Sequence, residues 1–149
     1  LVCHTKWLNL KKPINKYYIE GLLKAHEYHL TPYYLADFYE YKENNYKLGL
    51  YYYKYAAHLG NIPSIKKCIT HYTEIEVNYE EAEKYYKLGV KAGCKDTMYN
   101  YGLFYRTIRR NIEKMFELFY EAANLGHDSA RNELFMHSIA VINNTQCRL

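Results

Sequence analysis

The amino-acid sequence predicts an all-α fold, namely a right-handed α-solenoid of antiparallel helix pairs with a 33-residue period. Three similar segments, KYAAHLG, KLGVKAG and YEAANLG, end at Gly60, Gly93 and Gly126, so that successive copies are 33 residues apart. Apolar residues recur at intervals of three and four within each half of a unit, which is the spacing of one buried helical face. Each unit is therefore predicted to be two amphipathic helices.

Aligned on this period, the units agree in several columns without any gap. The shared positions are apolar in the first half of a unit, and polar, aromatic, small and then glycine in the second half. These columns are Leu35, Cys68, Tyr101 and Leu134; Ala36, Ile69, Gly102 and Phe135; Tyr39, Tyr72 and Tyr105; Asn45, Asn78 and Asn111; Tyr53, Tyr86 and Phe119; and Ala56, Gly89 and Ala122.

The residues between the predicted helices fit helix ends. Asparagine is a favoured N-cap, so Asn45, Asn78 and Asn111 are predicted to begin the second helices. Glu81 stands three residues after Asn78, where its side chain can complete a capping box. The repeated glycine fits the left-handed residue that closes a helix.

We expect a single repeat domain over residues 1–149. It divides into a partial unit (1–26), three repeats (27–59, 60–92 and 93–125), and a terminal helix and tail (126–149). Because the chain does not begin with Met, an upstream segment is expected.

The composition is that of a folded protein, with 49% hydrophobic and 24% charged residues. No apolar run approaches the roughly 18 residues of a membrane span, so no membrane association is predicted. The four cysteines form no CxxC pair, which favours a reducing, cytoplasmic location. The 20 tyrosines, with many lysines and asparagines, indicate an A+T-rich genome of the kind that giant viruses and some intracellular bacteria have.

The motifs LAxFY and YGLFY, followed by EEAEKYYKLGVKAG and EKMFELFYEAANLG, resemble Sel1-like repeats, relatives of the tetratricopeptide repeats. The resemblance covers about residues 14–140. The chain departs from the family between the two helices of a unit, where YKENN, TEIEV and RTIRR replace a glycine-rich turn. Ankyrin repeats share the period, but their TPLHxA signature is absent.

The resemblance implies that the first helices line a concave side that holds a protein or peptide partner. The predicted contact residues point inward from those helices without being packed in the core. They are Tyr33, Asp37, Tyr41, Lys66, Thr70, Thr73, Tyr99, Leu103, Arg106, Asn132 and Met136.

The sequence also contains residues that suit functions other than a scaffold or adaptor. Arg106, Arg109, Arg110 and Lys114 could contact phosphates, so a nucleic-acid-binding module is the alternative, although a solvated turn is the favoured interpretation. Cys68 and His71 have a spacing that zinc ligands use, but Cys68 falls in a core column. No GxSxG, HExxH, Walker or dinucleotide motif occurs, so we expect no enzyme, no metal and no cofactor unless an upstream domain supplies catalysis.

Overall fold

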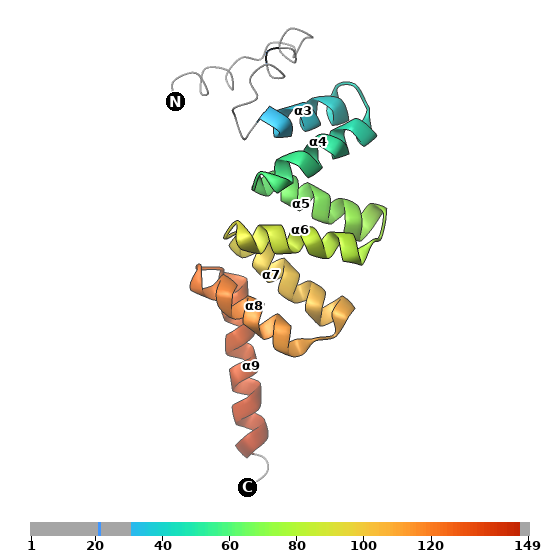
Figure 1. Ribbon diagram of the computed structural model, residues 1–149. Coiled ribbons are helices and arrows are strands. Elements are labelled where there is room, and N and C mark those ends of the chain that lie inside the picture. Colours follow the sequence, from blue (N-terminus) through green and yellow to red (C-terminus); the bar gives the residue numbers. More distant parts are fainter. Residues whose placement is uncertain (1–20, 22–30, 147–149) are drawn as a thin grey trace, which may run out of the picture.

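The computed structural model describes Gly21 and residues 31–146, and within these it is all-helical (Figure 1). This confirms the predicted all-α class. The α-helices and the two π-helical segments follow in chain order: α3 (Thr31–Tyr41), α4 (Tyr46–His58), α5 (Ile62–Thr70), η1 (His71–Ile75), α6 (Tyr79–Lys91), α7 (Lys95–Phe104), η2 (Tyr105–Arg109), α8 (Ile112–Asn124) and α9 (Asp128–Gln146). The predicted partial unit 1–26 lies almost entirely outside the described residues.

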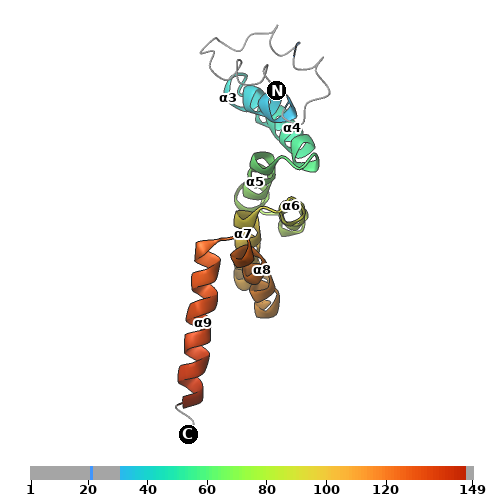
Figure 2. The same cartoon turned by 90° about the vertical axis from the view of Figure 1, so that its left-hand side faces the viewer.

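The helices stack one after another along an elongated body. Each helix packs mainly against the helices that precede and follow it in the chain. Figure 1 shows α3 and α9 at opposite ends, and Figure 2 shows α9 running away from the other helices. None of the helices in residues 31–146 combines the length and the apolar character needed to cross a bilayer.

The 33-residue period appears directly in the helix bounds. The second helices α4, α6 and α8 begin at residues 46, 79 and 112 and end at residues 58, 91 and 124. The side chains of Asn45, Asn78 and Asn111 each accept a hydrogen bond from the backbone N–H three residues later, which confirms the predicted N-caps.

The repeated glycine closes each second helix in the same way. Gly60, Gly93 and Gly126 have φ values of +84°, +71° and +79°. Each glycine N–H donates to the carbonyl three residues before it, and the next N–H donates to the carbonyl five residues before it. This is the Schellman arrangement, so the predicted left-handed closures are confirmed.

The turn inside each unit differs from the prediction. The first helices α5 and α7 end in one π-helical turn, and a left-handed residue then precedes the asparagine cap: Asn44, Val77 or Arg110. The backbone N–H of the cap donates to the carbonyl of Tyr39, Tyr72 or Tyr105. The expected capping box is wrong for this reason: the Asn78 N–H is already bonded to Tyr72, and the Glu81 carboxylate pairs with Lys84.

The core follows the predicted columns closely. Leu35, Cys68 and Tyr101 are buried, and so are the aromatic rings and small residues of the second helices. Close packing explains the small residues. A Cβ on Gly89 would lie 2.3 Å from Thr97 Cγ2, and one on Gly102 would lie 2.6 Å from the Phe119 ring. Phe135 departs from its column, because 63% of it is exposed on α9.

Candidate functional site

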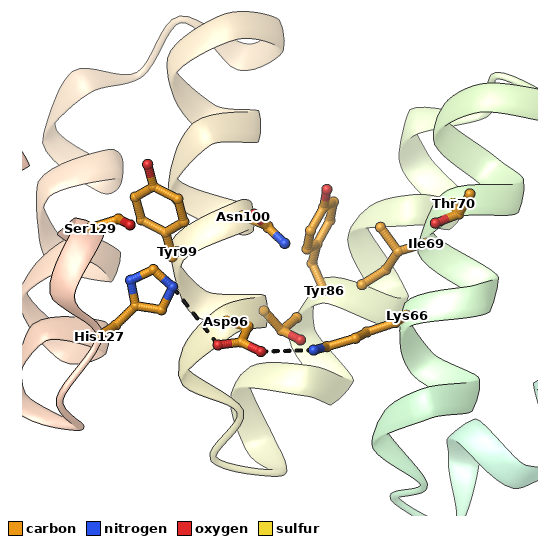
Figure 3. A pocket seen from close by; sticks show the side chains of 10 residues that line it. Lys66, Ile69, Thr70, Tyr86, Asp96, Tyr99, Asn100, His127 and Ser129 are labelled. Carbon is orange, nitrogen blue, oxygen red and sulfur yellow. Dashed lines mark hydrogen bonds and ion pairs between the residues drawn. The ribbon is translucent and has the colours of Figure 1, made fainter.

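An open cavity of about 480 Å³ lies where three consecutive first helices meet (Figure 3). Helices α5 and α7 supply most of its lining, with Tyr86 from α6 and residues from the start of α9. Of the predicted contact residues, Lys66, Thr70 and Tyr99 line it. The full lining is Lys66, Ile69, Thr70, Tyr86, Asp96, Thr97, Tyr99, Asn100, His127 and Ser129.

A row of charged and polar groups crosses one side of the cavity. Lys66 Nζ lies 2.8 Å from Asp96 Oδ2, and His127 Nε2 lies 3.8 Å from Asp96 Oδ1 (Figure 3). The hydrogen bond from Lys66 lowers the pKa of the Asp96 carboxyl, and the same bond raises the pKa of the Lys66 ammonium. Both side chains are about half exposed, so this ion pair stays accessible to a ligand.

His127 is oriented by its role at the start of α9. Its Nδ1 accepts a hydrogen bond from the Ala130 backbone N–H at 3.2 Å. In the neutral ring the proton is therefore on Nε2, the atom that faces Asp96. His127 thus fixes one wall of the cavity by capping the helix behind it.

Tyr99 is held between two rings. Its ring stacks on Phe119 at 5.1 Å and on His127 at 4.5 Å between centroids. Figure 3 shows the Tyr99 ring on the side of α7 toward His127, and the Asn100 amide on the side toward Tyr86. The stacking fixes the tyrosine before any ligand arrives, which reduces the entropy lost on binding.

The predicted contact residues of α3 are largely occupied within the protein. The Tyr53 hydroxyl lies 2.5 Å from Asp37 Oδ1 and 2.7 Å from Glu40 Oε2. Burial and these two carboxylates raise the pKa of Tyr53. Tyr33 packs at the edge of the core, and burial followed by the charge of Asp37 raises its pKa. Tyr41 is 63% exposed and hydrogen-bonds the Lys67 ammonium.

The remaining predicted residues lie outside the cavity lining. The Thr73 hydroxyl donates to the Ile69 carbonyl, and half-buried Leu103 packs against the core beside α8. Arg106 pairs with Glu133 of α9 at 3.3 Å. Asn132 and Met136 are exposed on α9. The structure therefore brings together the middle of the predicted set and not its two ends.

Sequence reasoning missed a set of pairings that links neighbouring first helices, although it named Thr73 and Arg106 as contact residues. Glu40, Thr73 and Arg106 stand in one column of the 33-residue frame, and Lys67, Asn100 and Glu133 stand in another. At the first junction Lys67 Nζ lies 3.1 Å from Glu40 Oε2, and at the third Arg106 lies 3.3 Å from Glu133. We call these two columns the junction pairs. The middle pair, Thr73 and Asn100, is uncharged, and the cavity opens at this junction.

The basic turn is largely neutralised by carboxylates. Arg109 lies 2.9 Å from Glu83 and 3.4 Å from Glu80, Arg106 pairs with Glu133, and Lys114 pairs with Glu117. Arg110 is the exposed left-handed residue of the turn. The arginines therefore tie α6, η2 and α9 together instead of forming a free cationic surface.

Cys68 and His71 belong to the core, as the column of Cys68 predicted. Cys68 is fully buried, and burial raises its pKa to about 12. The His71 ring hydrogen-bonds the Tyr46 hydroxyl through Nδ1 (2.7 Å) and faces the Glu76 carboxylate with Nε2 (2.9 Å). Over the residues that the structure describes, no three His, Cys, Asp or Glu side chains come together as a metal site.

The groups around the cavity are therefore hydrogen-bond donors and acceptors on a fixed aromatic support, an arrangement that suits ligand binding. No known family model matches this chain, and no curated protein sequence matches it, so the resemblance to Sel1-like repeats stays a prediction from its residues.

Proposed function

We propose that this chain is a non-enzymatic adaptor that binds a protein or peptide partner along the wall formed by its first helices. In this proposal the stack is a right-handed solenoid of Sel1-like type, and its concave side is the first-helix wall. The binding site is centred on the cavity between α5, α7 and the start of α9.

The observation that supports this proposal most directly is the accessible polar rim of the cavity. Lys66, Thr70 and Asn100 are exposed, and they line the cavity together with the stacked ring of Tyr99. An extended peptide offers carbonyl, amide and side-chain groups at a spacing that several first helices can reach in turn. Polar groups with an aromatic anchor are typical of such contacts.

The structure gives the nucleic-acid-binding alternative less support than the sequence did. Three of its four basic side chains pair with carboxylates, so phosphate contacts there would first have to break ion pairs. The buried thiols of Cys68 and Cys94 are both free, which agrees with the proposed reducing, cytoplasmic setting.

The test compares partner capture by the full chain and by a rim variant, Thr70→Arg with Asn100→Ala. Both positions are exposed, so these changes leave the core intact. Capture from a nuclease-treated lysate identifies candidates, and each purified candidate is then titrated against both proteins. We expect the rim variant to raise Kd at least about tenfold, which corresponds to about 1.4 kcal/mol.

Tyr120→Ala is the matched control, because Tyr120 is 64% exposed on α8 and does not line the cavity. It is expected to bind like the unmodified chain. Equal binding by all three proteins would refute the cavity as the site. Binding that is lost on nuclease treatment, and that weakens sharply between about 50 and 200 mM salt, would favour nucleic acid instead.

A further inference from the structure

The first helices α5, α7 and α9 all begin after one column of the 33-residue frame. This column holds Asn61, Cys94 and His127, and the carbonyl of each accepts the first backbone hydrogen bond of the helix that follows. Asn61 Oδ1 also accepts from the Ser64 N–H at 2.9 Å, whereas the Cys94 side chain makes no such bond. His127 Nδ1 accepts from the Ala130 N–H at 3.2 Å. At α9 an imidazole therefore takes the place of the asparagine cap.

The imidazole cap differs from an asparagine cap because it depends on the charge of the ring. Nδ1 accepts a hydrogen bond only while it carries no proton, and histidine gains or loses that proton between about pH 5 and 8. In the protonated ring, Nδ1–H would point at the Ala130 N–H, and two donors form no bond. The positive charge would also lie at the start of α9, where the helix dipole disfavours cations. Protonation of His127 is therefore incompatible with the cap.

His71 shows the opposite case within the same chain. Its ring hydrogen-bonds the Tyr46 hydroxyl through Nδ1 and faces the Glu76 carboxylate with Nε2. A hydroxyl can donate or accept, so both ring nitrogens keep a partner when His71 is charged. The partner of His127 Nδ1 is a backbone N–H, which can only donate. Protonation thus costs His127 a bond that His71 would keep.

The groups around His127 offer the protonated ring one new partner. Its Nε2 lies 3.8 Å from Asp96 Oδ1 across the cavity lining, and its side chain is 15% exposed. The other oxygen of Asp96 pairs with Lys66. The remaining charged or titratable side chains at the adjoining helix ends are Lys95, whose ammonium donates to the Gly126 carbonyl, Asp128 and Arg131, which pair with each other, Glu121 in the last turn of α8, and the stacked Tyr99.

We propose that His127 is a pH-sensitive cap that holds one wall of the cavity in place at neutral pH and releases it at acidic pH. When the ring is protonated it turns toward Asp96, which leaves the Ala130 N–H without its acceptor and removes the ring from its stack on Tyr99. The cap is thus present above the titration range of the ring and lost below it. Its effect on partner binding rests on the proposed function, but the cap itself is measured without any partner.

The experiment compares the full chain with His127→Asn and His127→Ala at about pH 7.5 and about pH 5, on either side of histidine titration. Asparagine keeps a capping oxygen that does not titrate, as Asn61 does in the same column, and alanine has no cap at either pH. Hydrogen exchange followed by NMR gives the protection of the Ala130 amide relative to an unstructured chain at the same pH. The ¹⁵N shifts of the His127 ring show which nitrogen carries the proton.

We expect the Ala130 amide of the full chain to match His127→Asn at the higher pH and His127→Ala at the lower pH. The change should be about fivefold, the effect of one N-cap. In His127→Asn it should stay below about twofold, because that cap does not titrate. The Ser64 amide, which Asn61 caps, is the internal control and should not respond to pH.

Three results would overturn the inference. One is a full chain that keeps the protection of His127→Asn at the lower pH, and another is a ring that carries its proton on Nδ1 at the higher pH. The third is an equal loss of protection at Ser64 and Ala130, which would indicate general loosening of the stack. Failure of the rim variant to weaken partner capture would refute the proposed site and leave these exchange rates unchanged.

Discussion

Val77 is a β-branched residue with a left-handed backbone conformation, which lowers the stability of the folded protein. Its φ of 50° is matched by Asn44 (50°) one unit before and by Arg110 (52°) one unit after. The left-handed region is unfavourable for residues with a Cβ and worst for β-branched ones, by roughly 1–2 kcal/mol. The turn geometry of the repeat imposes this conformation regardless of which side chain stands there.

Replacing Val77 by asparagine should stabilise the protein by about 1 kcal/mol. Asparagine tolerates the left-handed region and already occupies it at Asn44, while Val77 is 54% exposed and loses little packing. Urea unfolding of both proteins gives the difference in the free energy of unfolding. Ile75→Asn, at a 61% exposed position with negative φ, is the control and should not stabilise. A lower midpoint for Val77→Asn would contradict the strain argument.

The residue-level features that sequence could predict are those with local chemistry. The asparagine caps and closing glycines were predictable, because an amide side chain or a missing Cβ satisfies a helix end whatever surrounds it. The left-handed positions were not, because valine and arginine have no preference for them. The absence of the capping box could not be predicted either. The Asn78 N–H donates to a backbone carbonyl, that of Tyr72, and the sequence gives no side-chain signal for such a bond.

At the scale of helices, the units fit together through complementary small and large residues. The column Ala56, Gly89 and Ala122 belongs to the second helices, and the column Ser64, Thr97 and Ala130 belongs to the first helices that follow. Gly89, the only glycine in the first column, lies opposite Thr97, the only threonine in the second. A Cβ added to Gly89 would lie 2.3 Å from Thr97 Cγ2. Thr97 and Gly89 therefore form one packing unit at the junction of α6 and α7.

Gly89→Ala should destabilise the protein by about 1–2 kcal/mol, because overpacking at the junction outweighs the better helix propensity of alanine. Adding Thr97→Ala should restore most of this loss. The Thr97 hydroxyl has no hydrogen-bond partner, so its removal leaves no broken bond. A double-mutant cycle by chemical denaturation measures the coupling. Strictly additive effects would show that the two residues do not interlock.

Glu40 joins α3 to both following helices and makes that contact sensitive to acid. Burial acts to raise the pKa of its carboxyl, but the hydrogen bonds from Tyr53 and Lys67 outweigh burial and hold the pKa below the usual 4.5. A lowered pKa in the folded state means that the contribution of Glu40 is complete above about pH 4.5. It is lost as the pH falls through the folded-state pKa.

Glu40→Gln should therefore cost about 1–2 kcal/mol at pH 7, and the difference from the unmodified chain should shrink between about pH 4.5 and pH 3. Urea unfolding at pH 7, 5, 4 and 3 measures it. Glu43→Gln, an exposed change in the same turn, is the control for net charge. A difference that stays constant down to pH 3 would show that Glu40 is not linked to these partners in solution.

Across the whole molecule, stability should vary along the stack, because each helix contacts mainly its neighbours. Helices α5 to α7 have neighbours on both sides, while α3 and α9 stand at the ends of the described body. Local opening is cheapest where the fewest packed neighbours hold an element. The central helices should therefore exchange their amide hydrogens most slowly.

Ile65→Ala should lower amide protection from α4 through α7, because Ile65 is fully buried in the central cluster. Leu35→Ala should lower it only in α3 and α4, since Leu35 lies in a separate small cluster with Phe38. Hydrogen exchange followed by mass spectrometry resolves these segments. A uniform loss over all helices in both variants would indicate a single cooperative unit instead.

The sequence predicted only those residues of the candidate site that lie on α5 and α7, in the middle of the stack. The repeat frame assigned Lys66, Thr70 and Tyr99 to the first helices, and they do meet at one cavity. The frame cannot show that Tyr53 draws Asp37 inward, since that depends on a hydrogen bond between helices. His127 and Asp96 were missed because each lies at a helix start, where sequence suggests capping and not a cavity wall.

The junction pairs also bear on how modules of similar geometry find their correct neighbours while the chain folds. Acid faces base at the first junction, as Glu40 and Lys67, and base faces acid at the third, as Arg106 and Glu133. If α3 docked wrongly on α9, Glu40 would meet Glu133. If α5 met η2 in place of α3, Lys67 would meet Arg106. Each of these two errors would set like charges against each other, so the reversal of polarity along the stack disfavours these two mispairings.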